Sequence, residues 1–98
     1  KPFLFKYFDN PYHDQHIELM WYLYIILTTN GKLYTGITTD VERRFKEHKT
    51  GQKGAKFTKA NPPKKVVYTE EFEDRSSASK REWEVKKLSR KQKEALYK

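Results

Sequence analysis

The chain has 98 residues and a formal net charge of +8, so it is one small basic domain whose favoured partners are polyanions. It contains no cysteine, which excludes disulfides, thiolate catalysis and cysteine metal sites and fits a reducing, cytoplasmic environment. No apolar run approaches membrane-spanning length, so no membrane partner is expected.

The first 19 residues differ from the rest of the chain. They are rich in aromatic residues, contain Pro2 and Pro11, and have no helical or strand period. Met20 is the only methionine and directly precedes the first convincing strand. We therefore predict a loosely ordered or non-native extension over residues 1–19 and a folded domain over residues 20–98. The alternative is that these aromatic residues pack on the domain as an arm.

A β-hairpin is predicted next. Residues 21–28 and 32–38 are rich in aromatic and β-branched residues, and the segment between them ends in Gly31. A three-residue loop with Gly31 left-handed is a common hairpin connection. A two-residue Asn-Gly turn is the alternative, but it would mix apolar and polar residues on both faces. Sheets take the register that keeps one face apolar, so we predict the three-residue loop.

This register decides which side chains share a face. It pairs Tyr24 with Gly36 and Ile26 with Tyr34. Because successive strand residues point to opposite faces, Leu23 lies on the apolar face with its alternating neighbours. The two tyrosines are therefore predicted together on the other, less apolar face.

The rest of the chain is predicted to add one strand and three helices. A capping-box pattern at Thr39 and Glu42 starts a helix that runs to about residue 49 and stops at Gly51. The later elements are a basic loop over residues 52–64, a strand over 65–72, a helix over 76–88, and a short helix from the Ser89 capping box to about residue 96. The order β-β-α-β-α-α predicts an α+β fold, a small, mainly antiparallel three-stranded sheet flanked by helices.

Polar residues interrupt the apolar stripe of the first helix. Val41, Arg44, Phe45 and His48 follow the i, i+3, i+4, i+7 spacing of one helix face, yet two of the four are not apolar. One interpretation is structural: Arg44 snorkels at the edge of the stripe and His48 is a satisfied boundary histidine. The other is that both side chains point into a functional site.

A carboxylate interrupts the stripe of the second helix in the same way. Glu82 shares that stripe with Ala78, Val85 and Leu88, where a buried carboxylate needs a partner. That partner is either a lysine such as Lys86 or a cation. Mg²⁺ suits a single carboxylate, because it is often held by one or two carboxylates together with waters and phosphate oxygens.

Basic residues are concentrated between Arg43 and Lys65, with nine lysines and arginines against the single acid Glu47. Such a stretch can grip the phosphates of a nucleic acid, and the alternative is a solvated charged loop. The candidate nucleic-acid-binding residues are Arg43, Lys46, Lys53, Lys56 and Lys59.

These features together resemble a known family. The chain is similar to the GIY-YIG endonuclease superfamily, and its stretch LYTGITTDVERRFKEH looks like the small stand-alone bacterial members. The resemblance covers residues 21 to about 93. The residues that carry it, in order, are Tyr24, Tyr34, the motif glycine Gly36, Arg44, His48 and Glu82.

The resemblance implies a role for each matching side chain. Tyr24 would act as general base on water or orient it, and Tyr34 would support the water and the phosphate. Arg44 would stabilise negative charge on the phosphate, and His48 would share in proton transfer. Glu82 would be the single carboxylate ligand of Mg²⁺, or of Mn²⁺.

The function implied is a metal-dependent endonuclease that hydrolyses DNA phosphodiester bonds, directed to branched or damaged structures. No small-molecule cofactor is expected, and a protein partner is expected to supply specificity. Two alternatives stay open, a catalytically weak nucleic-acid-binding module and a protein-interaction domain for an acidic partner. The first alternative is supported by the lack of any asparagine after Asn61, since many active members have a late one.

Overall fold

The structure is a computed structural model that describes residues 19–51 and 60–98. The predicted extension over residues 1–19 and three of the candidate nucleic-acid-binding residues, Lys53, Lys56 and Lys59, fall outside the described residues except for Leu19. Among the helices of the described part, none is long and apolar enough to cross a membrane.

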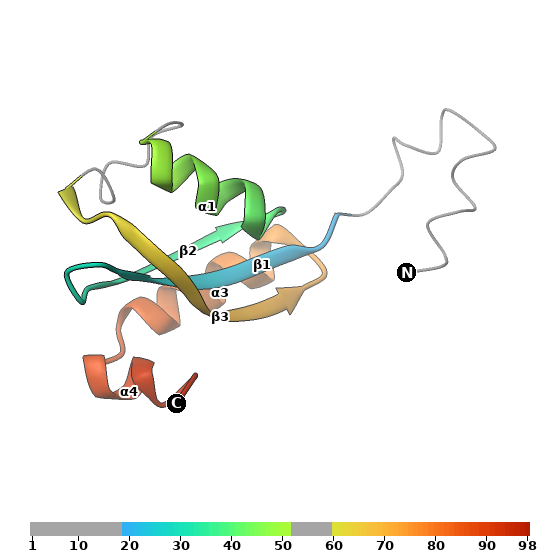
Figure 1. Cartoon of the computed structure of the whole chain (residues 1–98). Coiled ribbons are helices and arrows are strands. Elements are labelled where there is room, and N and C mark those ends of the chain that lie inside the picture. Colours follow the sequence, from blue (N-terminus) through green and yellow to red (C-terminus); the bar gives the residue numbers. More distant parts are fainter. Residues whose placement is uncertain (1–18, 52–59) are drawn as a thin grey trace.

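The described residues form three strands and three helices in the order β-β-α-β-α-α (Figure 1). The predicted α+β class and element order are confirmed. The elements are β1 (Trp21–Thr28), β2 (Leu33–Thr38), α1 (Val41–Thr50), β3 (Pro63–Phe72), α3 (Arg75–Lys86) and α4 (Arg90–Glu94).

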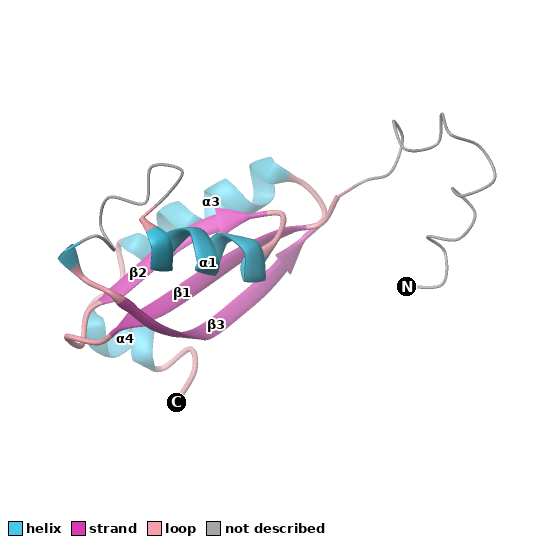
Figure 2. Ribbon diagram, turned by 45° about the horizontal axis from the view of Figure 1, so that its top comes forward, coloured by secondary structure: helices cyan, strands magenta, loops and turns pink. Residues whose placement is uncertain are grey.

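The three strands form one antiparallel sheet in the order β2-β1-β3. Helices α1 and α3 lie on opposite faces of this sheet (Figure 2). The central strand β1 is therefore covered on both sides, and four successive residues, Leu23, Tyr24, Ile25 and Ile26, are buried. A strand covered on both faces needs such a continuous apolar run rather than strict alternation.

The hairpin has the predicted register. Tyr24 pairs with Gly36 and Ile26 pairs with Tyr34. The Thr28 backbone N–H donates to the Lys32 carbonyl at 2.8 Å, which closes the three-residue loop. Gly31 has a φ of 82°, the left-handed conformation that a glycine adopts without steric strain.

The apolar face of the sheet packs on α3. Leu23 and Ile25 of β1 form a fully buried cluster with Val85 of α3, and half-buried residues such as Ile37 pack around it. On the same side, the buried hydroxyl of Thr35 has no hydrogen-bond partner among the described residues. The other face of β1 carries Tyr24 and Ile26, so the two tyrosines of the hairpin lie on the side of α1.

The first helix begins one residue later than its predicted cap. The N-cap is Asp40, whose carboxylate accepts a hydrogen bond from the Arg43 backbone N–H at 3.0 Å, so the predicted Thr39 cap is wrong. Aspartate is as good an N-cap as threonine, and its charge also favours the positive end of the helix dipole. The predicted stop at Gly51 is confirmed, with a φ of 74°.

Two further boundaries differ from the predicted ones. Strand β3 begins at Pro63 rather than at residue 65, because β3 is an edge strand and an edge tolerates proline. Helix α3 spans Arg75–Lys86 rather than 76–88, and Asp74 caps it by accepting from the Ser77 backbone N–H at 2.7 Å. The predicted capping box at Ser89 is confirmed at the start of α4.

Candidate active site

The ring of Tyr24 lies over the backbone of Gly36 on the neighbouring strand. A Cβ atom built at Gly36 would lie 2.5 Å from the Tyr24 hydroxyl oxygen and 2.7 Å from the ring carbon that bears it. Any side chain at this position would therefore collide with the ring. The motif glycine is explained by this close approach, which lets the Tyr24 hydroxyl reach across the edge strand β2.

The Tyr24 hydroxyl meets His48 of α1. The hydroxyl oxygen is 3.0 Å from Nε2 of the imidazole, and His48 is 1% exposed. Tyr34 packs edge-on against the same imidazole, with ring centroids 4.9 Å apart, and its ring lies 6.2 Å from that of Tyr24. Three rings from β1, β2 and α1 thus form one cluster on the α1 side of the sheet.

Arg44 joins this cluster from the next turn of α1. Its guanidinium lies close enough to the Tyr24 hydroxyl to favour the ionised form of that group, and its Nη1 donates to Glu47 Oε1 at 2.9 Å. The spacing of three residues from Arg44 to Glu47 was the sequence signal for this ion pair. Sequence analysis noted Glu47 only as the single acid of the basic stretch and so missed its role in holding Arg44.

The surroundings shift the pKa values of two members of the cluster in opposite senses. Burial raises the pKa of Tyr24 well above its usual value of about 10, and neighbouring Tyr34 adds to this, while the hydrogen bond and charge of Arg44 act against it. Burial and the charge of Arg44 lower the pKa of His48 to about 4. At neutral pH, His48 is therefore uncharged and Tyr24 keeps its proton.

Glu82 approaches the cluster from α3, the helix on the opposite face. Its charge contributes to raising the pKa of Tyr24, so the carboxylate lies within electrostatic reach of that hydroxyl. Glu82 also pairs with Lys86 at 3.1 Å, which is the structural alternative considered for it, and its side chain remains 23% exposed. A bound cation would therefore have to compete with Lys86 for the same carboxylate.

The donor set around Glu82 suits one kind of metal site. In the described residues, no three His, Cys, Asp or Glu side chains come together to hold an ion. An all-protein cage therefore does not fit, whereas Mg²⁺ bound by one carboxylate, waters and substrate phosphate oxygens does. The partly exposed carboxylate of Glu82 can supply that one ligand.

The other candidate residues of α1 lie apart from the cluster. The Arg43 side chain is 56% exposed and pairs with Glu47 at 3.6 Å, while Lys46 is 74% exposed and pairs with Glu42 at 3.8 Å. Of the predicted residues, Tyr24, Tyr34, Arg44 and His48 are thus brought together. Glu82 lies on α3, on the opposite face of the sheet, and acts on Tyr24 only through its charge. Arg43 and Lys46 line the outer surface of α1.

Comparisons with known proteins identify the family of this chain. The family model of the GIY-YIG catalytic domain matches residues 20–95. The chain is 49% identical over 76 residues to the UPF0213 protein YhbQ of Escherichia coli, covering 78% of this chain and 75% of that protein. It is 47% identical over 78 residues to a UPF0213 protein of Halobacterium salinarum, covering 80% of this chain and 100% of that protein.

A solved structure shares the fold as well as the sequence. The solution NMR structure of protein EF2693 from E. faecalis has 44% sequence identity and a TM-score of 0.54, covering 78% of this chain and 80% of that chain. The family model, the relatives and the element order all point the same way, and the chain belongs to the GIY-YIG catalytic domain family, among its small stand-alone UPF0213 members.

Proposed function

We propose that the protein is a metal-dependent endonuclease that hydrolyses phosphodiester bonds in DNA. Membership of the GIY-YIG catalytic domain family supports a nuclease in general. The observation that carries the proposal is the Tyr24 hydroxyl, which is held 3.0 Å from an uncharged His48 and lies within reach of the positive charge of Arg44. This combination offers both a proton acceptor and a positive charge at one point of the tyrosine cluster.

The proton path follows from the two pKa values. Tyr24 is protonated at neutral pH, so it cannot act as a base by holding a free phenolate. His48 is neutral, and its Nε2, when the ring proton is on Nδ1, accepts the hydrogen bond from the Tyr24 hydroxyl. Tyr24 can then take a proton from the attacking water while it passes its own to His48. The water oxygen bonds to phosphorus as the bond to the leaving sugar oxygen breaks; the leaving oxygen takes a proton from solvent, and His48 releases its extra proton to solvent, because its pKa is about 4.

Charge on the reacting phosphate is balanced by the groups around this path. Arg44 presents a guanidinium, fixed by Glu47, that can donate two hydrogen bonds to phosphate oxygens. Tyr34 packs against His48 and holds the imidazole in place beside Tyr24. When bound, Mg²⁺ or Mn²⁺ at Glu82 would neutralise charge that develops on the phosphate oxygens.

DNA is the proposed substrate because the chain is strongly basic, with a formal net charge of +8. Branched or damaged DNA fits a small domain better than a long specific sequence, since one small domain contacts few base edges. Sequence specificity would then come from a protein partner. The proposed location is the cytoplasm.

One observation favours a second candidate, a module that binds nucleic acid without cutting it. Glu82 already has a cationic partner, Lys86, at 3.1 Å. If Glu82 serves only to form this ion pair, the site has no carboxylate ligand for a metal. The protein would then bind nucleic acid without cutting it.

A nicking assay separates the two candidates. Wild type should nick duplex or branched DNA with Mg²⁺ and lose this activity with chelator. Glu82→Gln keeps the shape of the side chain and removes its charge, so cleavage should fall by about 100-fold or more while DNA binding persists. Glu84→Gln is the matched control, a carboxylate of the same helix that pairs with Arg81 away from the tyrosines. Nicking by Glu82→Gln at the wild-type rate would remove the metal role, and no nicking by wild type would favour the binding module.

A further inference from the structure

A groove of about 630 Å³ lies between α1 and β3. Its apolar floor consists of Val41 and Phe45 from α1 and Val66 from β3. None of the five candidate catalytic residues lines it, so it is separate from the site described above. Small-molecule pockets span roughly 300–1,000 Å³, so the groove is large enough for a nucleobase with its sugar.

The two elements expose apolar residues here for different reasons. On α1, Val41 and Phe45 are one turn apart on the flank toward β3, whereas Arg44 and His48 face the hairpin tyrosines. On β3, Val66 pairs with Ile26 of β1 and so points to the α1 side of the sheet. Shifts of register on both sides of this pairing bend β3 away from a regular ladder (Figure 1).

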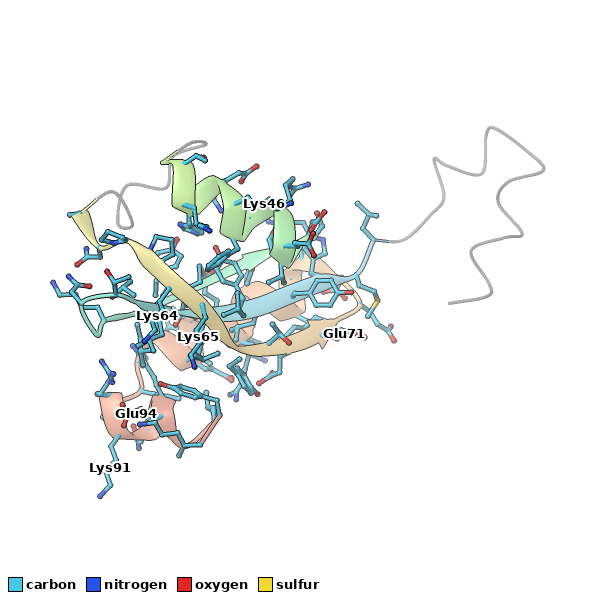
Figure 3. The ribbon with its side chains drawn as sticks, in the orientation of Figure 1. Lys46, Lys64, Lys65, Glu71, Lys91 and Glu94 are labelled. Carbon is cyan, nitrogen blue, oxygen red and sulfur yellow. The ribbon has the colours of Figure 1, made fainter. Side chains whose placement is uncertain are left out.

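Four lysines surround the apolar floor. Lys46 and Lys49 come from α1, and Lys64 and Lys65 come from β3; Figure 3 shows Lys46 on α1 and the β3 pair on the strand beneath it. The one acid in the lining, Glu42, is 86% exposed and pairs with Lys46. Among the residues that the structure describes, no ion pair to a carboxylate is formed by the other three lysines.

This combination matches the two parts of a nucleotide. A nucleobase has flat apolar faces that stack on aromatic rings, and its phosphates are bound by lysines as point charges. The Phe45 ring is the aromatic surface, and Lys49 Nζ lies over this ring, 5.8 Å from its centroid, so a stacked base would share the ring with this lysine. An acidic protein segment would use the lysines but has less need of an aromatic floor.

We propose that the α1–β3 groove binds an unpaired base of the nucleic-acid strand that is cut, with the base against Phe45 and its neighbouring phosphates on Lys49 and Lys64. This inference rests on the proposed nuclease function, and it names the substrate class. Bases inside an intact duplex are stacked and paired, so only a single-stranded segment or a flipped base can enter.

The position of the groove fixes how far the bound base lies from the cut. Helix α1 lies between the groove and the tyrosine cluster, and an α-helix with its side chains is about 10 Å across. Successive nucleotides of one strand rise about 3.4 Å in a duplex. Because an unpaired segment is more extended than this, the base in the groove would lie no more than about three nucleotides from the scissile phosphate. Gaps, flaps and branch points supply such a base.

Binding of a short fluorescent single strand, measured in chelator, tests the role of the base. The matched probe is the same strand with its central bases removed but its phosphates kept. Wild type should bind the intact strand about tenfold more tightly than the abasic strand. Phe45→Leu keeps an apolar side chain but removes the ring, so the two strands should then bind equally. Trp83→Leu, which removes an exposed ring on α3, should leave the tenfold difference in place.

The lysines are tested by the salt dependence of the same binding. Lys64→Gln should make the slope of log affinity against log salt less negative by about 0.7, the value for one phosphate contact on a single strand. Lys80→Gln, a matched change of an exposed lysine on α3, should leave the slope unchanged. Equal binding of both strands by wild type would overturn the proposal and favour a groove for phosphates or for an acidic protein.

Two other outcomes would also overturn the proposal that the groove binds a base. One is that Phe45→Leu still prefers the intact strand, and the other is that Trp83→Leu alone loses this preference. Because chelator prevents cleavage, these results are independent of the nuclease assay. If the protein nicks DNA with metal but binds both strands equally, the base-binding groove is rejected and the nuclease function stands. If it prefers the intact strand but does not nick DNA, the nuclease function is rejected and the base-binding groove stands.

Discussion

Gly36 is the position where a single added atom would change the site. A Cβ there would overlap the Tyr24 hydroxyl and ring carbon, and Tyr24 is too deeply buried to move freely. We expect Gly36→Ala to destabilise the protein by roughly 1–3 kcal/mol, the usual cost of overpacking, and to displace the hydroxyl from His48. Urea denaturation measures the first effect and nicking the second.

The control for this prediction is the same change in a Tyr24→Leu background. A leucine does not reach across Gly36, so the added methyl group has room and the further loss of stability should be small. If Gly36→Ala lowers the unfolding free energy equally in both backgrounds, the glycine is needed for its backbone conformation and not to make room for Tyr24.

His48 gives the protein a stability that depends on pH. Its folded-state pKa of about 4 lies below the ordinary value of about 6.5, so the folded state binds fewer protons than the unfolded state between these values. The contribution of the neutral, buried His48 to the free energy of unfolding is therefore fully present above pH 6.5. It is lost as the pH falls to about 4, and its size is on the order of 3 kcal/mol.

The measurement is urea denaturation of wild type and His48→Gln across this range of pH. Glutamine has no charge to gain, so the difference in unfolding free energy between the two proteins should shrink as the pH falls from 6.5 to 4. Exposed carboxylates such as Asp74 titrate in both proteins and cancel in the difference. A constant difference would show that His48 is not buried as a neutral group.

Asp40 is expected to stabilise the start of α1. Its carboxylate caps α1 by accepting from the Arg43 backbone N–H, whereas the sequence pattern had pointed to Thr39. Asp40→Ala should lower the unfolding free energy by about 1 kcal/mol, and Thr39→Ala should change it much less. If urea denaturation shows a larger loss of stability for Thr39→Ala than for Asp40→Ala, the N-cap is Thr39, as the sequence suggested.

The elements differ in how far the sequence determines them. The hairpin register followed from an apolar face and Gly31, both of which are local signals. The start of α1 was misplaced because Thr39 and Asp40 are both good caps, and the choice depends on how the chain leaves β2. The start of β3 was misplaced because a proline stops a central strand but not an edge, and the position of β3 in the sheet is a tertiary property.

The same limit applies to the candidate site. A resemblance over six positions was enough to select the tyrosine cluster, because the family pattern combines residues that are far apart in the chain. The sequence left two interpretations of Glu82 open, a lysine partner or a cation. The structure contains the ion pair with Lys86, and the charge of Glu82 also acts weakly on the pKa of Tyr24. The α1–β3 groove had no sequence signal, since Phe45 and Val66 come to line one groove only through the packing of α1 beside β3.

At the scale of the whole molecule, the proposed function places three regions along α1 that would contact a nucleic acid. The tyrosine cluster lies between the hairpin and α1, and the lysine-lined groove lies on the other flank of the same helix. The exposed residues Arg43 and Lys46 add positive charge along α1. A strand that crosses α1 can therefore contact all three regions.

This arrangement predicts that DNA binding is mainly electrostatic. Each phosphate contact contributes roughly −0.9 to the slope of log affinity against log salt for duplex DNA. Replacing both Arg43 and Lys46 by glutamine should therefore make the slope less negative by about 1.8, twice that value. Binding that barely changes with salt in the wild type, or a slope unchanged in the double variant, would contradict this account of the surface.

The central claim is that the Tyr24 hydroxyl takes part in phosphodiester hydrolysis, and Tyr24→Phe tests it most directly. The phenyl ring still covers Gly36, so fold and DNA affinity should stay near wild type. Single-turnover nicking with Mg²⁺ should slow by about 100-fold or more, the usual contribution of a group that transfers a proton. Tyr97→Phe, the same deletion in the C-terminal segment after α4, should cut at the wild-type rate. Cleavage by Tyr24→Phe at that same rate would contradict the claim.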